Sequence, residues 1–487
     1  MKLNLNGNIN KIYVQSLCMM FYHGVKFPEN GESCDNLELT VTVNESKSAV
    51  HCTALLRQDE RFVEKSALCN FMENESVDRT YKIAIGQAIY SAGAEMTGRD
   101  SGYGILTGIR PSKVVAEILS HNDVTDTMNI LTKRYLMSIE KARLCIEVAK
   151  NETEILRSTD DSKCSVYISI PFCPSRCNYC SFISYAGKKL FSLIPDYLEK
   201  LCVDIKNTFD NIKKLGLTVS CIYIGGGTPT ILSEEQLDRL LSTIYSSTDV
   251  NALDEYTLEG GRPDTITEKK LETAKKYGIT RISINPQTLN DDVLERIGRR
   301  HTVAEFLDAY KKVSESGIPI VNTDLIAGLD YDNYDSFKAT VDKIIELSPA
   351  NITVHSFCVK NAAQIRSDDK DIYGKNTDFA RKSIDYSICA LLNNGYTPYY
   401  MYRQKNTVGN SENVGYAKKA FLGLYNVYMM SDAHTVFGIG AGATTKLVKH
   451  VNGNSCIERI FSPKYPYEYL KENRDFYDKA KNFFDRS

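Results

Sequence analysis

Residues 165–182 read SVYISIPFCPSRCNYCSF, a short apolar run followed at once by three closely spaced cysteines. The run VYISI at 166–170 is bounded by polar and turn residues, as is typical of a buried strand. Cys173, Cys177 and Cys180 then lie within eight residues, in the spacing C-x3-C-x2-C. Because reactive groups in parallel α/β folds collect at the carboxyl ends of strands, the position of this loop suggests a functional role.

The same strand pattern recurs along the chain, with helical patterns between the repeats. Further apolar runs occur at 220–224, 256–259, 281–284, 319–326 and 351–357. Two of the intervening helices begin with capping boxes, Ser233 with Gln236 and Thr302 with Glu305. A closed barrel needs eight such units in about 250 residues. Six units predict an α/β fold with an incomplete, TIM-like (β/α)6 barrel.

The regions on either side of the barrel have different textures. Residues 1–160 combine a hairpin pattern, LELTVTVNE and SAVHCTALLRQ, with helical patterns from about 80 onward. The charged stretch RSTDDSK at 157–163 is the predicted boundary. We therefore expect an N-terminal α+β and helical domain of unknown role at 1–160 and the barrel at 161–395. Tyrosine-rich strands and a final helix at 396–487 predict a C-terminal region that caps the substrate.

Composition narrows the functional classes. The 487 residues are 43% hydrophobic and 25% charged, with a net charge of −2. The sequence also has no long basic run, and nucleic-acid binding normally needs clustered positive charge, so nucleic acid is not an expected partner. No apolar run is long enough to span a membrane, and the N-terminus has no signal-peptide core. We expect a cytoplasmic protein, in which most of the 14 cysteines are small buried apolar residues.

The spacing of Cys173, Cys177 and Cys180 favours an iron–sulfur cluster. Zinc sites normally take four ligands, usually as two pairs, and no nearby histidine completes a set. A thioredoxin-type site would be a single C-x-x-C beside a helix start. Three thiolates on one short loop can bind three irons of a [4Fe–4S] cube, leaving the fourth iron open to an exogenous ligand.

Other polar residues fall at the ends of the later predicted strands. GGGTPT at 225–230 follows the second strand, and Glu259 ends the third. Gln287 lies just past the fourth, Asp324 late in the fifth and His355 late in the sixth. Since these ends meet at one rim of a barrel, we expect the side chains to surround a common site.

The cysteine motif after YISIPF, followed by GGGTPT, is similar to the radical S-adenosylmethionine superfamily. It resembles the branch that contains the oxygen-independent coproporphyrinogen III oxidases and their haem-chaperone relatives. LTGIRPSK, LEGGRPDTIT, RISINPQT, MYRQKN and GIGAGATTK further resemble the second-type clostridial and bacillar coproporphyrinogen dehydrogenases over nearly the whole chain. The resemblance implies a partial barrel of the radical S-adenosylmethionine type.

The resemblance also implies cofactor ligands. Cys173, Cys177 and Cys180 would hold a [4Fe–4S] cluster, and S-adenosylmethionine would chelate its unique iron. One or two molecules of this cosubstrate are implied. Its further contacts would be Tyr167 and Tyr179 near the cluster and adenine, and Gly226, Gly227 and Thr228 at the methionyl amino group. No side chain beyond these cofactor sites is predicted to be catalytic.

Further cosubstrate contacts follow from the same resemblance. Glu259 would pair with the ammonium group, Arg299 with the carboxylate and Asp324 with the ribose hydroxyls, while Gln287 would also line the site. Arg300 adjoins Arg299, and the sequence leaves open which of them faces inward. The remaining matches to family contacts, which are looser, are Cys358 and Thr444.

The implied reaction is anaerobic. A 5′-deoxyadenosyl radical would abstract hydrogen from a propionate, and loss of CO2 and one electron would leave a vinyl group. Two rounds would convert coproporphyrinogen III to protoporphyrinogen IX in haem biosynthesis, with a flavodoxin or ferredoxin as electron donor. Phe182 stands where the best-known oxidases have a fourth cysteine. The absence of this cysteine is a feature shared with the haem chaperones. A haem-binding chaperone, or a radical enzyme for another tetrapyrrole, therefore remains an alternative.

Overall fold

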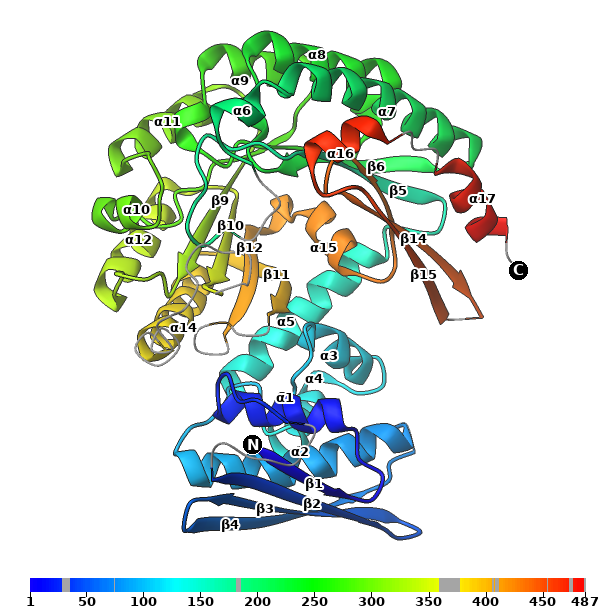
Figure 1. The fold of residues 1–487 in the computed structure, drawn as a ribbon, viewed down its shortest axis with the longest axis vertical. Helices are drawn as coiled ribbons and strands as arrows, with labels where there is room; N and C mark the ends of the chain where they lie inside the picture. Colours follow the sequence, from blue (N-terminus) through cyan, green and yellow to red (C-terminus); the bar gives the residue numbers. More distant parts are fainter. Residues whose placement is uncertain are drawn as a thin grey trace. The chain divides into compact units, whose positions relative to one another are not determined.

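The computed structural model describes most of the chain. The described residues are 1–28, 36–73, 75–180, 185–358, 377–404, 407, 411–452, 454–472 and 476–485. They belong to two compact units, one of residues 1–150 with 401–406 and one of residues 151–400 with 407–487 (Figure 1). Residues 401–406 are thus grouped with the N-terminal unit, although they lie far along the sequence.

Six parallel strands in chain order form the centre of the larger unit. They are β5 (Lys163–Ile170), β6 (Thr218–Gly226), β7 (Glu255–Glu259), β8 (Arg281–Ser283), β9 (Ile320–Ala327) and β10 (Asn351–Ser356). Each predicted strand coincides with one of them, so the predicted α/β partial barrel is confirmed. Both predicted capping boxes also form, at the starts of α8 (Glu234–Ser247) and α11 (Val303–Glu315).

Helices connect these strands and lie along the outer side of the curved sheet (Figure 1). Besides α8 and α11 they are α6 (Lys188–Phe191), α7 (Ile194–Lys214), α9 (Glu268–Lys276), α10 (Asp291–Arg296), α12 (Tyr334–Leu347) and α14 (Thr377–Asn393). Their apolar faces pack inward, as the buried Leu237, Leu240 and Leu241 of α8 illustrate. This is the arrangement expected for parallel strands joined by helical crossovers.

The region after residue 396 extends the sheet at both edges. β12 (Glu412–Lys418) pairs antiparallel with β10, and β11 (Tyr396–Arg403) follows it. At the other edge β13 (Thr435–Ile439) pairs parallel with β5, followed by β14 (Thr444–Val451) and β15 (Asn454–Phe461). The helices of this region are α15 (Leu424–Met430), α16 (Pro466–Lys471) and α17 (Tyr477–Asp485). That this region caps the substrate remains a prediction.

A buried ion pair lies at the amino ends of two barrel strands. Nε of Arg281, at the start of β8, lies 3.4 Å from Oε2 of Glu255 at the start of β7. Arg281 also donates to the carbonyl oxygens of Phe421 and Leu422, and Glu255 accepts from the backbone of Leu424. The segment before α15 is thereby fastened to the amino ends of the strands. The predicted site residues lie toward the opposite ends.

The smaller unit contains a four-stranded sheet covered by helices. Its strands are β1 (Lys2–Asn6), β2 (Leu37–Glu45), β3 (Ala49–Gln58) and β4 (Arg61–Asn70), and β2 and β3 form the predicted hairpin. The helices are α1 (Lys11–Phe21), α2 (Val77–Thr97), α3 (Pro111–Leu119), α4 (Val124–Asn129), a π-helix at Ile130–Arg134, and the part of α5 (Ile139–Leu156) up to residue 150. α2 packs on α1 so closely that a methyl group on Gly93 would overlap the ring of Phe21.

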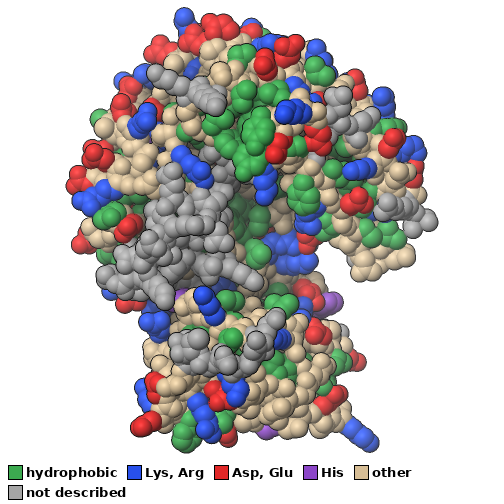
Figure 2. Space-filling model, in the orientation of Figure 1, with side chains coloured by type: hydrophobic (Ala, Val, Ile, Leu, Met, Phe, Trp, Pro, Cys, Tyr) green, Lys and Arg blue, Asp and Glu red, His purple; other side chains and the backbone are tan. Residues whose placement is uncertain are grey.

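The surface carries charges of both signs. Acidic and basic side chains are interspersed on the face shown in Figure 2, in keeping with the near-zero net charge. In the described part of the chain, no helix combines the length and the apolar character needed to cross a membrane.

Candidate functional site

The cysteine loop leaves the carboxyl end of β5 and folds back on itself. Cys173 N donates to the carbonyl oxygen of Tyr185, and Tyr185 N donates to that of Pro171, at 3.0 and 2.8 Å. Cys180 N donates to the carbonyl oxygen of Cys177 at 3.0 Å. Cys177 is 9% exposed, and the other two cysteines are half-buried. Phe182 lies outside the described residues.

A turn after α10 braces this loop from one side. The backbone and side-chain amides of Asn178 donate to the carbonyl oxygens of Ile297 and Arg296, at 3.0 and 2.9 Å. Ser175 Oγ donates to the carbonyl oxygen of Gly298 at 3.2 Å. Gly298 has φ of +79°, a conformation that favours glycine, so the tight turn depends on this residue. The loop conformation is therefore fixed by the segment between β8 and α11 as well as by β5.

The glycine-rich end of β6 lies directly against the cysteine loop. Gly227 N donates to the carbonyl oxygen of Ile170, and Thr228 N to that of Phe172, both at 2.8 Å. Thr228 Oγ1 and Cys173 Sγ form a hydrogen bond of 3.3 Å. A methyl group on Gly227 would lie 2.5 Å from the oxygen of Phe172 and 2.9 Å from Sγ of Cys173. The backbone approach thus requires glycine at 227.

We expect Gly227→Ala to force the first cysteine away from its position. The clash involves backbone and thiol atoms rather than a flexible side-chain end, so the free energy of unfolding should fall by about 1–3 kcal/mol. Thermal unfolding and iron uptake on reconstitution should both show the defect. Gly108→Ala is the matched control, because a methyl group there meets no atom within 4 Å. Equal stability and iron content in the two variants would contradict this account of Gly227.

Arg299 faces inward and Arg300 is exposed. Arg299 is 8% exposed, and its Nε donates to Tyr179 Oη at 3.2 Å. Its Nη1 donates to the carbonyl oxygens of Gly261 and Asn285, at 3.2 and 2.7 Å. The side chain therefore joins the cysteine loop to the segments that follow β7 and β8. The choice that the sequence left open falls on Arg299.

Glu259 and Asp324 are acidic groups on the inner side of the barrel. Burial, followed by the nearby Asp324, raises the pKa of Glu259 to about 8, although hydrogen bonds from Gly226 and Tyr223 act in the opposite direction. A methyl group on the neighbouring Gly225 would lie 2.6 Å from Glu259 Oε2. A cationic ligand group bound here would favour the ionised carboxylate and lower its pKa again, so the raised pKa is consistent with a binding site for a cation.

Asp324 is held by its own partners. Asn285 Nδ2 donates to Asp324 Oδ2 at 2.9 Å, and Asp324 N donates to Asn285 Oδ1 at 3.1 Å. His355 Nε2, from the end of β10, lies 3.8 Å from Asp324 Oδ2. The structure thus brings together the residues predicted at the ends of the third, fifth and sixth strands.

Gln287 is buried beside Asp324 in an unusual backbone conformation. Its φ is +72°, a value that few non-glycine residues adopt. Its N donates to the oxygen of Asp324 at 3.1 Å, and its own oxygen accepts from Ile326 N at 2.9 Å. Among the described residues its Oε1 has no hydrogen-bond partner although it is buried. A strained residue with an unsatisfied acceptor fits a place where a ligand supplies the missing donor.

Three predicted contacts remain. Tyr167 of β5 stacks with Tyr223 and Tyr425, at ring-centroid distances of 6.2 and 6.3 Å, and burial together with the nearby Glu259 raises the pKa of Tyr167. Cys358 follows β10 and forms an isolated bridge with Thr407. Thr444 begins β14 on the far side of β13 and β5, so the six barrel strands separate it from Cys358 in the sheet order.

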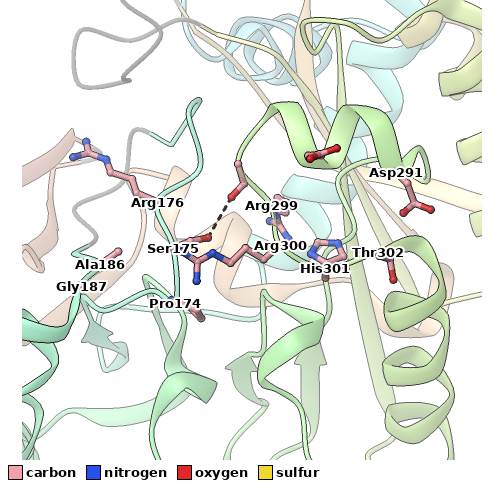
Figure 3. Close-up of a pocket in the computed structure, with 12 residues that line it drawn as sticks. Pro174, Ser175, Arg176, Ala186, Gly187, Asp291, Arg299, Arg300, His301 and Thr302 are labelled. Carbon is pink, nitrogen blue, oxygen red and sulfur yellow. Dashed lines mark hydrogen bonds between the residues drawn. The ribbon is translucent and has the colours of Figure 1, made fainter.

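A pocket of about 840 Å³ opens beside the cysteine loop (Figure 3). Its lining comprises Pro174, Ser175, Arg176, Ala186 and Gly187 on one side, and Asp291, Glu295, Gly298, Arg299, Arg300, His301 and Thr302 on the other. Glu259, Gln287 and Asp324 do not line it. Of the residues predicted to bind S-adenosylmethionine, Arg299 therefore lines this pocket, whereas these three acidic and amide side chains do not.

The residues of the loop fit an iron–sulfur cluster better than a single metal ion. Within the described ranges, no three His, Cys, Asp or Glu side chains converge on one ion, as zinc would require. A [4Fe–4S] cube differs because each cysteine binds a different iron. Three thiols on one braced loop, with glycine backbone beside Cys173 and a cation beside Cys177, suit that demand. Cys173, Cys177 and Cys180 are the residues that would hold it.

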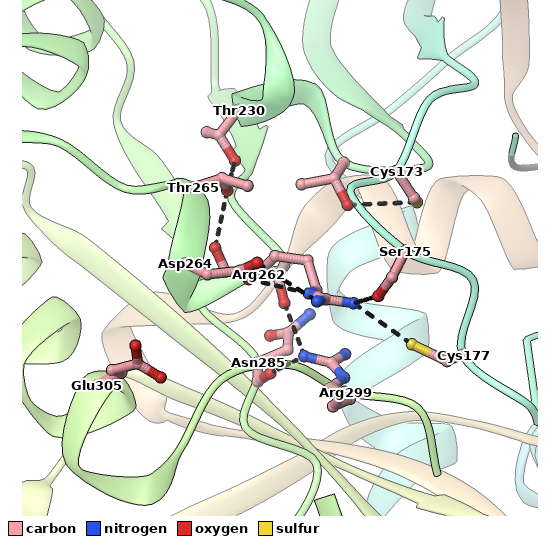
Figure 4. Close-up of polar contacts among 12 residues, drawn as sticks. Cys173, Ser175, Cys177, Thr230, Arg262, Asp264, Thr265, Asn285, Arg299 and Glu305 are labelled. Carbon is pink, nitrogen blue, oxygen red and sulfur yellow. Dashed lines mark hydrogen bonds and ion pairs between the residues drawn. The ribbon is translucent and has the colours of Figure 1, made fainter. Parts of the chain in front are cut away.

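That cation, Arg262, was not among the predicted site residues. Its Nη1 donates to Cys177 Sγ at 3.6 Å and to Ser175 Oγ at 3.1 Å (Figure 4). Sequence reasoning noted LEGGRPDTIT only as a phrase that resembles a family. A signal for Arg262 was available in the sequence, because it is a basic residue three positions after the end of a barrel strand and so falls at the rim of the barrel.

Comparison with known proteins identifies the same superfamily that the sequence motifs resemble. The radical SAM superfamily matches residues 167–344. The oxygen-independent coproporphyrinogen-III oxidase-like protein HemZ of Bacillus subtilis is 30% identical over 485 residues, 97% of this chain and 95% of that protein. The heme chaperone HemW of Lactococcus lactis is 30% identical over 58% of this chain and 69% of its own length. Among solved structures, coproporphyrinogen III oxidase (HemN) of Escherichia coli shares the fold, with a TM-score of 0.51 and 21% identity over 68% of this chain and 71% of that one.

Proposed function

Because the chain belongs to the radical SAM superfamily, as a relative of the HemZ protein along nearly its whole length, we propose that it is a radical S-adenosylmethionine enzyme. Its proposed reaction is the oxygen-independent decarboxylation of two propionates of coproporphyrinogen III to vinyl groups, giving protoporphyrinogen IX. The observation that carries the proposal is the braced three-cysteine loop beside Gly227, in a chain that matches HemZ over 97% of its length. A cytoplasmic location and a flavodoxin or ferredoxin as electron donor belong to the same proposal.

The side chains around the loop have the chemistry that the cosubstrate requires. Glu259 would accept hydrogen bonds from the ammonium group of the cosubstrate, and Asp324 would accept them from its ribose hydroxyls. Gln287 Oε1 would accept a hydrogen bond from a further donor. The hydrogen bonds of Arg299 use Nε and Nη1, and Nη2 carries two more N–H groups that suit a carboxylate. When bound, the cluster and the cosubstrate supply the electron and the hydrogen abstraction. The protein's part is to orient them and to exclude water.

Aromatic side chains next to the loop support a tetrapyrrole substrate. Tyr185 packs on Tyr465 with ring centroids 5.7 Å apart, and Tyr465 stacks on Tyr467 at 5.4 Å. Tyr465 and Tyr467 are 44% and 47% exposed. Exposed rings that cluster in this way suit contact with a large apolar molecule. A porphyrinogen macrocycle fits this description.

A haem chaperone is the second candidate function, because HemW proteins also match this chain. The HemW match covers 58% of this chain, whereas the HemZ match covers 97%. The similarity to HemZ therefore covers more of this chain than the similarity to HemW and includes residues outside the barrel. This difference favours the enzyme.

Turnover distinguishes the two functions. In reconstituted, reduced protein we expect 5′-deoxyadenosine to form only when coproporphyrinogen III is present, at about two per protoporphyrinogen, because each of the two propionates consumes one cosubstrate. Anaerobic assays with product separation by chromatography would measure both compounds. A chaperone would instead retain haem through gel filtration and leave coproporphyrinogen III unchanged. That pair of results would overturn the proposed enzyme activity.

A further inference from the structure

Arg262 is fixed in place by the backbone that follows β7. It precedes a short 3-10 turn, Pro263–Thr265, and is 3% exposed. Its carbonyl oxygen accepts from Thr265 N at 3.1 Å and from Thr265 Oγ1 at 2.8 Å. Thr230, which follows the glycines of β6, is hydrogen-bonded to Thr265 at 2.6 Å between the hydroxyl oxygens. The backbone of Arg262 is thereby tied to two barrel strands.

The guanidinium group is aimed at the cysteine loop by an acidic neighbour. Asp264 accepts from Nε at 3.0 Å through one oxygen and from Nη2 at 3.4 Å through the other. This two-point contact fixes the plane of the guanidinium group. Nη1 then points to the loop, where it reaches Ser175 Oγ and Cys177 Sγ (Figure 4).

This contact has an electrostatic consequence for a cluster held by Cys177. The potential of an iron–sulfur cluster depends on its net charge, on hydrogen bonds to its sulfur atoms and on its exposure to solvent. Reduction adds negative charge, which a nearby cation and an N–H···S hydrogen bond both stabilise. Because Arg262 is buried, solvent screens its charge little.

We propose that Arg262 is a positioning residue for the cluster, which holds Cys177 Sγ through Nη1 and makes reduction of the cluster more favourable. This inference rests on the proposed function only in requiring that the three cysteines bind a [4Fe–4S] cluster. It assigns a role to the GRPD segment at 261–264, with Asp264 aligning the guanidinium group. The role concerns the first electron transfer and not the choice of substrate.

The test compares four variants in reconstituted full-length protein by iron analysis, circular dichroism and redox titration followed by electron paramagnetic resonance. In Arg262→Gln we expect reduction to become at least tenfold less favourable, a midpoint potential about 59 mV lower for a one-electron couple. Arg262→Lys keeps the charge and should recover part of this shift. Ser175→Ala removes the neighbouring acceptor of Nη1 together with the loop's hydrogen bond to Gly298, but keeps the charge at Cys177. Arg300→Gln removes an exposed, solvent-screened charge. Both should leave the potential unchanged.

The outcomes separate this inference from the proposed function. Arg262→Gln with a full cluster and an unchanged potential would overturn the inference alone, as would an equal shift in Ser175→Ala, which would make loop bracing the cause. If folded Arg262→Gln takes up no cluster and Arg262→Lys restores it, the positioning role is supported. If neither Arg262 variant folds, the residue serves the folding core and the inference is wrong. Wild-type protein that binds no cluster would overturn the proposed function as well.

Discussion

Replacing Cys177 by Ala is expected to leave the reconstituted protein without its [4Fe–4S] cluster. Cys177 is the middle residue of the three, is buried, and accepts a hydrogen bond from the Arg262 guanidinium group. Its loss leaves two thiolates for a cube that has one open iron already, so a second iron would have no protein ligand. Iron content should fall from about four per chain to a small residue, and the broad absorption near 400 nm typical of such clusters should disappear.

The matched control for this variant is Cys202→Ala. Cys202 lies in α7 and is 6% exposed, so its burial resembles that of Cys177 while its position is outside the loop. Both substitutions remove one buried sulfur atom, with a similar packing cost. We expect Cys202→Ala to retain the full iron content and absorption. A full cluster in Cys177→Ala, or its loss in both variants, would contradict the assignment of the three ligands.

The central sheet could be predicted because each of its strands carries a local signal. Strands buried on both faces are short apolar runs, and helical patterns with capping residues separate them. VYISI at 166–170, for example, lies within β5, and Ser233 with Gln236 starts α8 as expected. Consecutive parallel strands with helical crossovers usually lie side by side, so the strand order followed from the chain order.

The edges of the sheet could not be predicted in the same way. β13 pairs with β5 across about 270 residues of chain, and β12 reverses direction beside β10. Neither pairing leaves a local signal, because strand partners are chosen by packing with distant residues rather than by neighbours in sequence. Residues after 396, predicted as a C-terminal capping region, thus contribute strands to both edges of the barrel sheet.

The candidate site was predictable in position but less so in detail. The ends of the strands located Glu259, Asp324 and the glycines of β6, since parallel strands end at one rim. The choice between Arg299 and Arg300 depends on the turn after α10, which sequence periodicity does not describe. Arg262 was missed because its significance comes from a contact with Cys177, 85 residues away in sequence.

Glu259→Gln is expected to make the ligand-free protein more stable. The pKa of Glu259 is raised from 4.5 to about 8, so the native state keeps a proton that the unfolded state releases. This carboxyl group therefore lowers the stability of the native state progressively as pH rises from about 4.5 to 8. Glutamine carries no such penalty. At pH 7 the gain should be about 3 kcal/mol as an upper limit, because the side chain keeps partial exposure to solvent.

The same substitution should weaken the binding of S-adenosylmethionine while sparing the cluster. Removal of the carboxylate costs a charge-assisted hydrogen bond to the ammonium group, on the order of 1.5–3 kcal/mol, or roughly 10- to 150-fold in affinity. In the wild type, affinity should rise between pH 6 and 7.5, as Glu259 ionises while an α-amino group with a pKa of about 8 stays charged. The glutamine variant should lose this dependence.

Calorimetric titration and denaturant unfolding, each at several pH values, would measure the two effects together. Glu199→Gln is the control, since it removes an exposed carboxylate from α7 and should change neither quantity. The ionisation penalty comes from the surroundings of the carboxyl group, so higher stability is expected whatever the role of Glu259, and lower stability would contradict the raised pKa. A ligand-binding role predicts lower affinity in addition, whereas a purely structural role predicts that affinity stays the same. Unchanged affinity at every pH would remove Glu259 from the binding site.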